Sequence, residues 1–232
     1  MIGIIGAMDA EIDMYLDKIT NLKEITCKIF TFYQGKFNGQ EIVLVKSGVG
    51  KVFSAMVCQY MIDTYNPSMI LLTGVGGALN PILEIGDVVI GVDTAHHDFD
   101  ARELGFKLGQ ISYTDLRFFK AEEKLVELAM KASLKDNKII SGRILTGDQF
   151  FTQAKKLESK YLTEELKGDC IEMEGASVGQ VCSINEIPNL IIRTVSDKAD
   201  GTAVEDYNKF TPIVAKNSFE IVGYIVKNIG IQ

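Results

Sequence analysis

The sequence predicts an α/β protein in which a mostly parallel sheet is flanked by helices. Short apolar runs alternate along the chain with segments whose apolar residues recur at helical spacing. Such runs are typical of strands that are buried on both faces, as in a parallel sheet covered by helices. The dipeptide Asn38-Gly39 stands between two apolar runs and indicates an antiparallel hairpin, so we expect the sheet to be mixed.

The strands are expected where short apolar runs are bounded by turn residues. In chain order they are 2–7, two antiparallel strands within 28–46, 69–73, 87–92, 138–145 and 188–195. The expected helices are 9–20, 51–64, 120–134, 153–166, 175–185 and a last one from about 205 almost to the C-terminus. No Pro/Gly/Ser-rich linker interrupts the alternation, so we expect a single domain over residues 1–232.

Composition excludes several classes of protein. The 24 basic and 31 acidic residues give a net charge of -7, which disfavours binding to nucleic acid or to anionic lipid. No apolar run approaches the length of about 18 residues that a membrane span needs. The chain opens without a positively charged leader, and none of its four cysteines forms a CxxC pair. We therefore expect a protein of the reducing cytoplasm.

Acidic side chains follow expected strands at the points where those strands end. Glu11 comes soon after the first strand, Glu172 and Glu174 follow a short apolar run, and Asp197 follows the last apolar strand. In open α/β sheets, ligands bind outside the carboxyl ends of the strands. We therefore expect these carboxylates to share one polar site that performs acid/base chemistry on a small molecule.

Several familiar motifs are absent or incomplete. The glycines near the start lack GxGxxG spacing. The segment 47–51 resembles the end of a phosphate loop, but the first glycine of such a loop would fall at position 45, which is Val. NAD and nucleoside triphosphates are therefore not expected as ligands. His96 and His97 would point to opposite faces of a strand, so they are not expected to bind one metal ion. The chain has no GxSxG elbow.

Seven segments taken together resemble one family. They are 3–11, 46–52, 73–79, 86–89, 146–150, 172–176 and 193–200. In this combination and order they resemble the nucleosidases that cleave 5'-methylthioadenosine and S-adenosylhomocysteine, within the purine nucleoside phosphorylase and nucleosidase superfamily. The resemblance extends from residue 2 to about residue 207, which is nearly the whole chain.

The resemblance implies a three-layer α/β/α fold, a homodimer, and hydrolysis of the bond between adenine N9 and ribose C1'. The products would be adenine and the 5'-thioribose, and 5'-deoxyadenosine would be a further substrate. No metal or organic cofactor is implied. Such an enzyme would clear products of methyl transfer and polyamine synthesis and serve methionine salvage.

Cleavage of this bond leaves positive charge on the ribose and negative charge on the base, so an acid is needed near adenine N7. By resemblance, Asp197 is that acid, and Ser196 and Ala199 would bind the substrate. The alternative from the residues alone is that Ser196 or Asp197 caps the next helix. Glu174 would accept a hydrogen bond from the ribose 2'-hydroxyl.

Two more acids have a helix-based alternative. Glu172 would stand near the ribose hydroxyls or support Glu174, and Glu11 with Arg193 would hold and activate the attacking water. The alternative for the three glutamates is stabilisation of a helix dipole from the first turn, and for Arg193 a structural ion pair. Carboxylates in the first loop, Asp9 among them, would repel phosphate, which favours water as the nucleophile.

The remaining predicted contacts are apolar or backbone groups. Phe150 would stack on adenine, and Phe151 would offer backbone groups to the base edge. The ribose, the base or the 5' region would be lined by Met8, Val49, Val75, Gly76, Phe106, Met173 and Tyr207. Ala101 and Leu104, in a loop near 101–112, would reach the partner subunit's 5' pocket. For each apolar residue the alternative is ordinary core packing.

Three rival functions remain from the sequence. A phosphorylase would require phosphate and would form ribose 1-phosphate. A futalosine-type nucleosidase would share the fold and the acids but would take another 5' group. A catalytically silent nucleoside-binding or adhesion protein is the third rival, and the intact Glu11, Glu174 and Asp197 argue against it.

Overall fold

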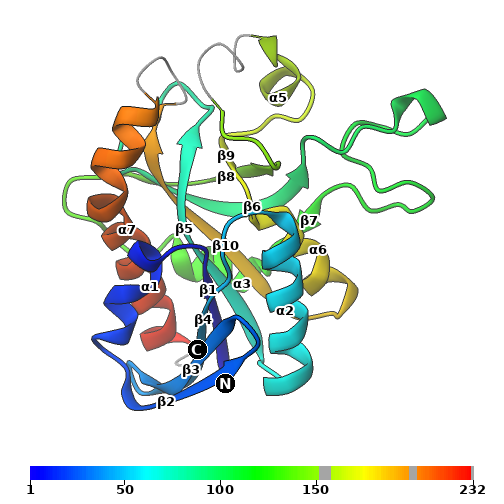
Figure 1. Cartoon of the computed structure of the whole chain (residues 1–232). Coiled ribbons are helices and arrows are strands. Elements are labelled where there is room, and N and C mark those ends of the chain that lie inside the picture. The colour runs from blue at the N-terminus through cyan, green and yellow to red at the C-terminus, as the bar shows by residue number, and fades with distance from the viewer. Residues whose placement is uncertain (152–157, 199–202, 231–232) are drawn as a thin grey trace.

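The computed structural model places a ten-stranded mixed sheet between two layers of helices (Figure 1). It describes residues 1–151, 158–198 and 203–230, and of 203–214 the backbone alone. The strands are β1 (Ile2–Gly6), β2 (Thr20–Cys27), β3 (Phe30–Phe37), β4 (Gln40–Lys46), β5 (Met69–Ala78), β6 (Val88–His96), β7 (Phe119–Lys120), β8 (Ile139–Thr146), β9 (Cys170–Glu172) and β10 (Asn189–Asp197). The helices described are α1 (Asp9–Leu16), α2 (Lys51–Tyr65), α3 (Glu123–Ala129), α5 (Tyr161–Glu164), α6 (Gly175–Ile184) and α7 (Ala203–Asn228), with a 3-10 turn η1 (Arg102–Leu104).

Part of the sheet closes on itself. The strand order is β10-β6-β8-β9-β5-β1-β4-β3-β2, β7 lies beside β6, and β10 also pairs with β5. The strands β5, β10, β6, β8 and β9 therefore form a ring, while β1, β4, β3 and β2 extend from it as an open sheet. Because β1, β5 and β10 run parallel to one another, their carboxyl ends meet at the same edge.

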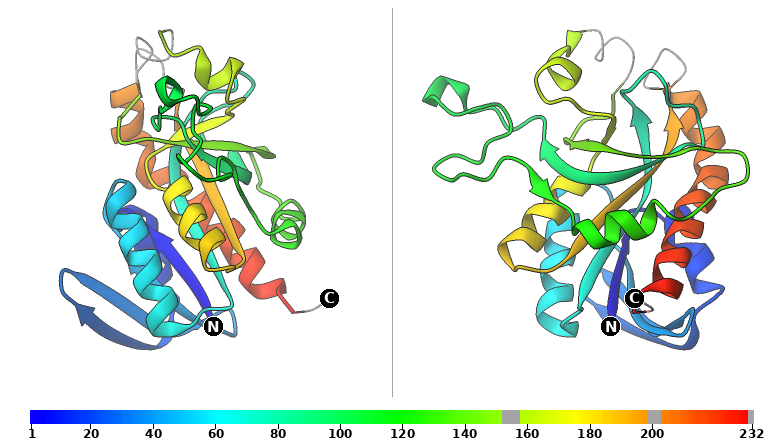
Figure 2. Two further views of the ribbon diagram at one scale, coloured as in Figure 1. Left: turned by 90° about the vertical axis from the view of Figure 1, so that its right-hand side faces the viewer. Right: turned by 180° about the vertical axis from the view of Figure 1, so that it is seen from behind.

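The two helix layers are fixed by the alternation of side chains along the strands. Ile4, Leu44 and Leu71 face the cluster that also contains apolar residues of α1, α3 and α7. Their neighbours Ile5 and Leu72 face the opposite cluster, which contains residues of α2 and α6. Figures 1 and 2 show α1 and α7 on one side of the sheet and α2 and α6 on the other. A strand that is buried on both faces requires apolar residues at its odd and at its even positions, and these strands have them.

Most expected elements are confirmed, including the hairpin at Asn38-Gly39, where both residues have positive φ as a two-residue turn of this kind requires. The strand β2 was not predicted, because nearly all its side chains are exposed at the sheet edge and show no buried stripe. The expected helix 9–20 ends at Leu16, and 120–134 is helical only over α3. Of the expected helix 153–166, residues 153–157 lie outside the described part of the chain, and the described remainder contains α5.

No helix in the described ranges is long and apolar enough to cross a membrane. Residues 97–118 form an arm that projects away from the sheet, with η1 near its tip (Figures 1 and 2). The arm lies on the side of the molecule that carries α2 and α6.

Candidate active site

A cavity opens at the edge of the sheet where β1, β5 and β10 end. It contains about 550 Å³ of empty space, its open mouth included. Segments far apart in the sequence contribute to its lining, and the lining residues are Ala7, Met8, Glu11, Val49, Val75, Gly76, Gly77, Gln149, Phe150, Phe151, Ile171, Glu172, Met173, Glu174, Ser196 and Asp197. Four carboxylates therefore share one otherwise largely apolar chamber.

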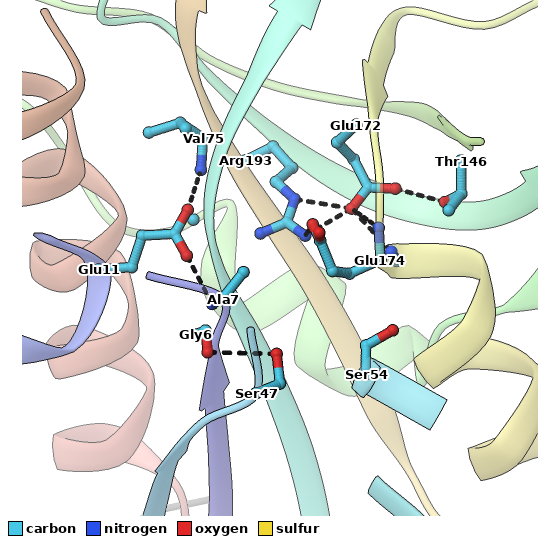
Figure 3. A network of polar contacts seen from close by, with 12 residues as sticks. Gly6, Ala7, Glu11, Ser47, Ser54, Val75, Thr146, Glu172, Glu174 and Arg193 are labelled. Carbon is cyan, nitrogen blue, oxygen red and sulfur yellow. Dashed lines mark hydrogen bonds and ion pairs between the residues drawn. The ribbon is translucent and has the colours of Figure 1, made fainter. Parts of the chain in front are cut away.

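Glu11 is held by backbone groups. Its Oε2 accepts hydrogen bonds from the N–H groups of Ala7 (2.6 Å) and Met8 (3.1 Å), and its Oε1 accepts one from Val75 (3.0 Å) (Figure 3). The first two bonds satisfy N–H groups at the start of α1, so part of the helix-based alternative holds. Burial raises the pKa of Glu11, although the Arg193 charge and the three N–H groups oppose that rise.

Glu172 makes the helix-start contacts that the helix-based alternative describes, and it also binds the backbone of Glu174. Its Oε2 accepts hydrogen bonds from the backbone N–H groups of Glu174 (3.0 Å) and Gly175 (2.7 Å), at the start of α6. The same oxygen is paired with the Arg193 guanidinium, and the other oxygen accepts the Thr146 hydroxyl. Because so many donors surround it, Glu172 serves to anchor α6 and Arg193 at the base of the cavity.

Glu174 reaches away from its own helix. Its Oε1 accepts the N–H of Gly50 (2.8 Å), and its Oε2 lies 3.1 Å from Arg193 Nη2. Burial and the neighbouring Glu172 raise its pKa to about 8, although Arg193 and the Gly50 N–H oppose that rise. A carboxyl with this pKa can be charged or neutral near neutral pH.

Arg193 lies between the glutamates (Figure 3). Its side chain is fully buried, and burial opposes its charge, but the surrounding carboxylates raise its pKa further above the ordinary value. Its Nη1 has no hydrogen-bond partner among the described residues. A Cβ at Gly74 would overlap both this Nη1 and Glu11 Oε1. Glycine at this position therefore lets the guanidinium and the Glu11 carboxylate flank the same spot.

Asp197 enters the cavity through an irregularity in β10. The register between β10 and β5 shifts between Val195 and Asp197, as in a β-bulge. Without it, Ser196 and Asp197 would point to opposite faces, whereas both line the cavity. Ser196 Oγ donates to Asp197 Oδ2 at 3.0 Å. The capping alternative for these two residues concerns a helix start beside residues 199–202, which lie outside the described part of the chain.

The apolar wall comes mainly from the loop after β8 and from Met8, Val49 and Met173. Phe151 is buried and its ring lies edge-on to His97, with centroids 5.1 Å apart, whereas Phe150 is 38% exposed at the cavity. Gly76 leaves no room for a side chain, since a Cβ there would lie 2.7 Å from Cys170 Sγ. Backbone of β5 can therefore approach a ligand closely.

Some predicted residues are not brought to this cavity. Phe106 was expected to help line the ribose or 5' region, but it lies on the projecting arm, against Tyr113, and is absent from the lining. Ala101 and Leu104 lie on the same arm, and Leu104 is 67% exposed. Ala199 and the Tyr207 side chain lie outside the described part of the chain.

The cavity and its support also include residues that were not singled out from the sequence. Ala7, Gly77, Gln149 and Ile171 line it, and Gly50, Gly74 and Thr146 support the acids. Several of these residues belong to the motifs that carried the family resemblance, so the motif positions between the acids held the missing signal.

Among the described residues, no group of three His, Cys, Asp or Glu side chains is placed to hold a metal ion. His96 Nε2 lies 3.0 Å from Gln180 Oε1, and His97 Nδ1 lies 3.4 Å from the Tyr161 hydroxyl, so the two rings have separate partners. The four carboxylates that line the cavity can donate and accept protons in a chamber whose other walls are largely apolar.

Comparison with known proteins agrees with the fold. The phosphorylase superfamily model matches residues 1–227. A 5'-methylthioadenosine/S-adenosylhomocysteine nucleosidase of Staphylococcus haemolyticus is 37% identical over 98% of this chain and 99% of its own length. The crystal structure of a Neisseria meningitidis enzyme of that name, in complex with methylthio-immucillin-A, has a TM-score of 0.93 at 33% identity and covers 98% of this chain and 99% of its own. A futalosine hydrolase of Helicobacter pylori has a TM-score of 0.91 at 31% identity and covers 98% of this chain and 97% of its own.

The fold and the buried acids thus define a protein of the phosphorylase superfamily. Within it, the chain belongs to the family of 5'-methylthioadenosine/S-adenosylhomocysteine nucleosidases, which are hydrolases of N-glycosyl bonds.

Proposed function

We propose that the chain hydrolyses the N-glycosidic bond of 5'-methylthioadenosine and of S-adenosylhomocysteine, and releases adenine and the 5'-thioribose. The observation that carries the proposal is the convergence of Glu11, Glu174 and Asp197, from three distant segments, on one cavity. The family supports the substrate class, because its members carry these two substrates in their names.

Asp197 would protonate adenine N7 as the C1'–N9 bond breaks. The bonding electrons move to the base, and the proton on N7 makes the base a neutral leaving group. Asp197 lies at the bulged end of β10, is 3% exposed and lines the cavity, so it can reach a bound base from within the chamber. Phe150 and Phe151 lie on the same cavity wall and would flank the adenine ring.

Glu174 would accept a hydrogen bond from the ribose 2'-hydroxyl and stabilise the positive charge that develops on the sugar. Met173 would pack along the ribose. Glu172 would act through Glu174, because it binds the Glu174 N–H and shares Arg193 with it.

Glu11 would take a proton from the water that attacks C1'. Its raised pKa makes its carboxylate a stronger base than an exposed glutamate. The free Nη1 of Arg193 faces the same spot and would orient that water. Asp9 was expected to help repel phosphate, but it pairs with Lys46 outside the cavity, so Glu11 would exclude phosphate from this position.

The decisive test is incubation of pure protein with 5'-methylthioadenosine in phosphate-free buffer. Adenine and free methylthioribose should appear. Release that depends on added phosphate would make the chain a phosphorylase, and no release in either buffer would contradict the proposed substrate. Asp197→Asn should keep ligand binding and lose most turnover, and normal turnover by this variant would contradict the acid assignment.

The 5' substituent has a second candidate. The fold of this chain is about as similar to that of a futalosine hydrolase, at 31% identity and nearly full coverage, as it is to that of the methylthioadenosine-cleaving relative. We propose 5'-deoxyadenosine as a further substrate, because the reacting atoms are the same and the 5' group is smaller. A panel of nucleosides with methylthio, homocysteinyl, deoxy and futalosine-type 5' groups would rank the four by kcat/KM.

We further propose that two copies form a homodimer and that Ala101 and Leu104 of each arm approach the partner's cavity. Val52, Phe53 and Met56 form an exposed apolar face on α2, which lies just after the cavity residue Val49. A second copy would cover this face. Sedimentation of the wild-type protein should give a mass of two chains. The substitution Met56→Asp should lower the measured mass toward that of one chain.

We propose that the protein performs this reaction in the cytoplasm. All four cysteines are free, and three of them are buried. Thiols that persist unpaired are typical of a reducing compartment. Fractionation of cells that express the protein at its natural level would test this location.

A further inference from the structure

A ring of three charged residues lies next to the cavity without lining it. Lys51 Nζ is 2.8 Å from both carboxylate oxygens of Asp98 and 3.6 Å from Asp148 Oδ2. Asp98 Oδ2 also accepts the backbone N–H of Asp148 (3.0 Å). Asp148 Oδ1 in turn accepts the backbone N–H of Lys51 (3.1 Å). Each member of the ring thus contacts the other two.

The ring joins three segments that have no covalent connection near the site. Asp98 follows β6, Lys51 is the first residue of α2, and Asp148 follows β8. The Lys51 and Asp98 side chains are only 24% and 22% exposed. Burial opposes the charge of Asp98, but the Lys51 ammonium and the Asp148 N–H more than offset it and hold its pKa below the ordinary value. The ring is therefore a preorganised, charged link.

Each end of this link continues directly into the cavity wall. Gly50, one residue before Lys51, donates the N–H that binds Glu174, and Val49 lines the cavity. On the other side, Asp148 is followed by Gln149, Phe150 and Phe151, all of which line the cavity. The ribose side and the base side of the site are thus tied to one carboxylate.

The ring differs from the ordinary ion pairs of this chain. Lys36 and Glu41 pair at 3.4 Å with about half of each side chain exposed, which contributes little. Asp93 on β6 makes a half-buried pair with Arg143 that resembles the Lys51–Asp98 pair in burial. However, neither Asp93 nor Arg143 borders a residue of the cavity lining. Asp93 therefore provides a matched control.

We propose that Asp98 is a positioning residue that sets the spacing between the Gly50 N–H, which holds Glu174, and the loop that carries Phe150. The assignment rests on the proposed function for its catalytic readout. An asparagine at position 98 carries no negative charge, and it replaces one of the two oxygens that Lys51 contacts with an NH2 group that cannot accept from the ammonium. One wall of the cavity would then shift relative to the other.

The test compares Asp98→Asn with Asp93→Asn at a temperature well below the melting point of both. Misplacement of reacting groups by a fraction of an ångström to 1 Å costs up to about a hundredfold. Asp98→Asn should lower kcat/KM about tenfold to a hundredfold, with a fall in kcat and a rise in KM, whereas Asp93→Asn should lower only the melting temperature. Lys51→Met should reproduce the defect of Asp98→Asn, and Asp98→Glu should restore part of the activity.

Hydrogen exchange on the free protein separates this proposal from the proposed function. In Asp98→Asn, amides in segments 48–51 and 147–151 should exchange about tenfold faster, and those of β10 should not. Equal kcat/KM in the two aspartate variants, or unchanged exchange in both segments, would overturn the positioning role. A wild-type protein that releases no adenine would overturn the proposed function, while the exchange comparison would still decide whether the ring fixes the two segments.

Discussion

Glu11 and Glu174 are buried carboxylates on opposite sides of one guanidinium, and they are satisfied in different ways. Glu11 accepts three backbone N–H groups from β5 and the start of α1, all fixed in the body of the fold. Glu174 accepts a single backbone N–H, from Gly50 in a loop, together with Arg193. Burial raises the pKa of both carboxyls, and for Glu174 burial and the neighbouring Glu172 raise it to about 8. The two side chains therefore differ in the groups that oppose the rise: three backbone N–H groups and Arg193 for Glu11, and Arg193 with the single Gly50 N–H for Glu174.

The largest effect is expected from Glu11→Gln. The amide cannot accept a proton from water, so turnover should fall by about 10²–10⁴-fold. The NH2 group of the amide would also face a backbone N–H donor, where the carboxylate has an acceptor oxygen. Steady-state kinetics with 5'-methylthioadenosine would measure the loss, with adenine binding as the control for an intact cavity. A variant with more than a tenth of wild-type kcat would contradict the role of Glu11 as base.

Gly74→Ala would separate the two halves of the comparison. The new methyl group would occupy the spot that Arg193 Nη1 and Glu11 Oε1 flank, and would push them apart. We expect kcat to fall about a hundredfold, with a lower melting temperature from overpacking. Val75 is the neighbouring control: Val75→Ala removes side-chain volume from the cavity wall and leaves the N–H that binds Glu11, so it should change KM more than kcat.

Glu174→Gln tests, through stability, whether folding raises the pKa of Glu174. Below about pH 4.5 Glu174 is protonated whether the chain is folded or unfolded, and between that value and about 8 only the folded protein keeps the proton. The group therefore contributes stability at low pH that is lost as pH rises through about 8. The melting temperature of wild type minus that of Glu174→Gln should decline from pH 5 to pH 9. A difference that grows with pH would mean that Glu174 is charged in the resting site, despite the neighbouring Glu172 and Glu11.

The smallest effect is expected from Thr146→Val. The hydroxyl accepts the Ala176 N–H at 2.7 Å and donates to Glu172, so valine leaves a buried N–H without a partner. The cost should be about 1–3 kcal/mol in the free energy of unfolding. Thr146→Ser is the control that keeps the hydroxyl. If kcat falls together with the free energy of unfolding, Glu172 depends on Thr146 for its position.

The sequence was sufficient for the elements that are buried on both faces. Apolar runs of both parities marked β1, β5 and β10, and the acids after them indicated the edge where the cavity lies. The edge strand β2 escaped because its exposed residues carry no burial pattern. Ring closure through β9 also escaped, since a three-residue strand is too short to show a period.

Within the site, the residue types were foreseeable and their pairings were not. The division of labour between Glu172 and Glu174 depends on Gly50, which is 124 residues away from Glu174 in sequence. Phe106 lies outside the motifs that carry the resemblance, on an arm that leaves the body of the fold, where its ring contacts Tyr113. Contacts of this range follow from the topology, which local patterns do not encode.

Arg193 is a single buried cation among Glu11, Glu172 and Glu174, and the proton that Glu174 keeps up to about pH 8 partly compensates the imbalance. A ligand with a positive charge at the position of the ribose would supply the missing cation directly. Its binding at neutral pH would then expel the stored proton into solvent, and the calorimetric heat of binding would change with the ionisation enthalpy of the buffer. A neutral ligand of the same shape would expel none. The charges around the cavity thus favour the positively charged state that the sugar reaches when its bond to the base is breaking over the neutral state.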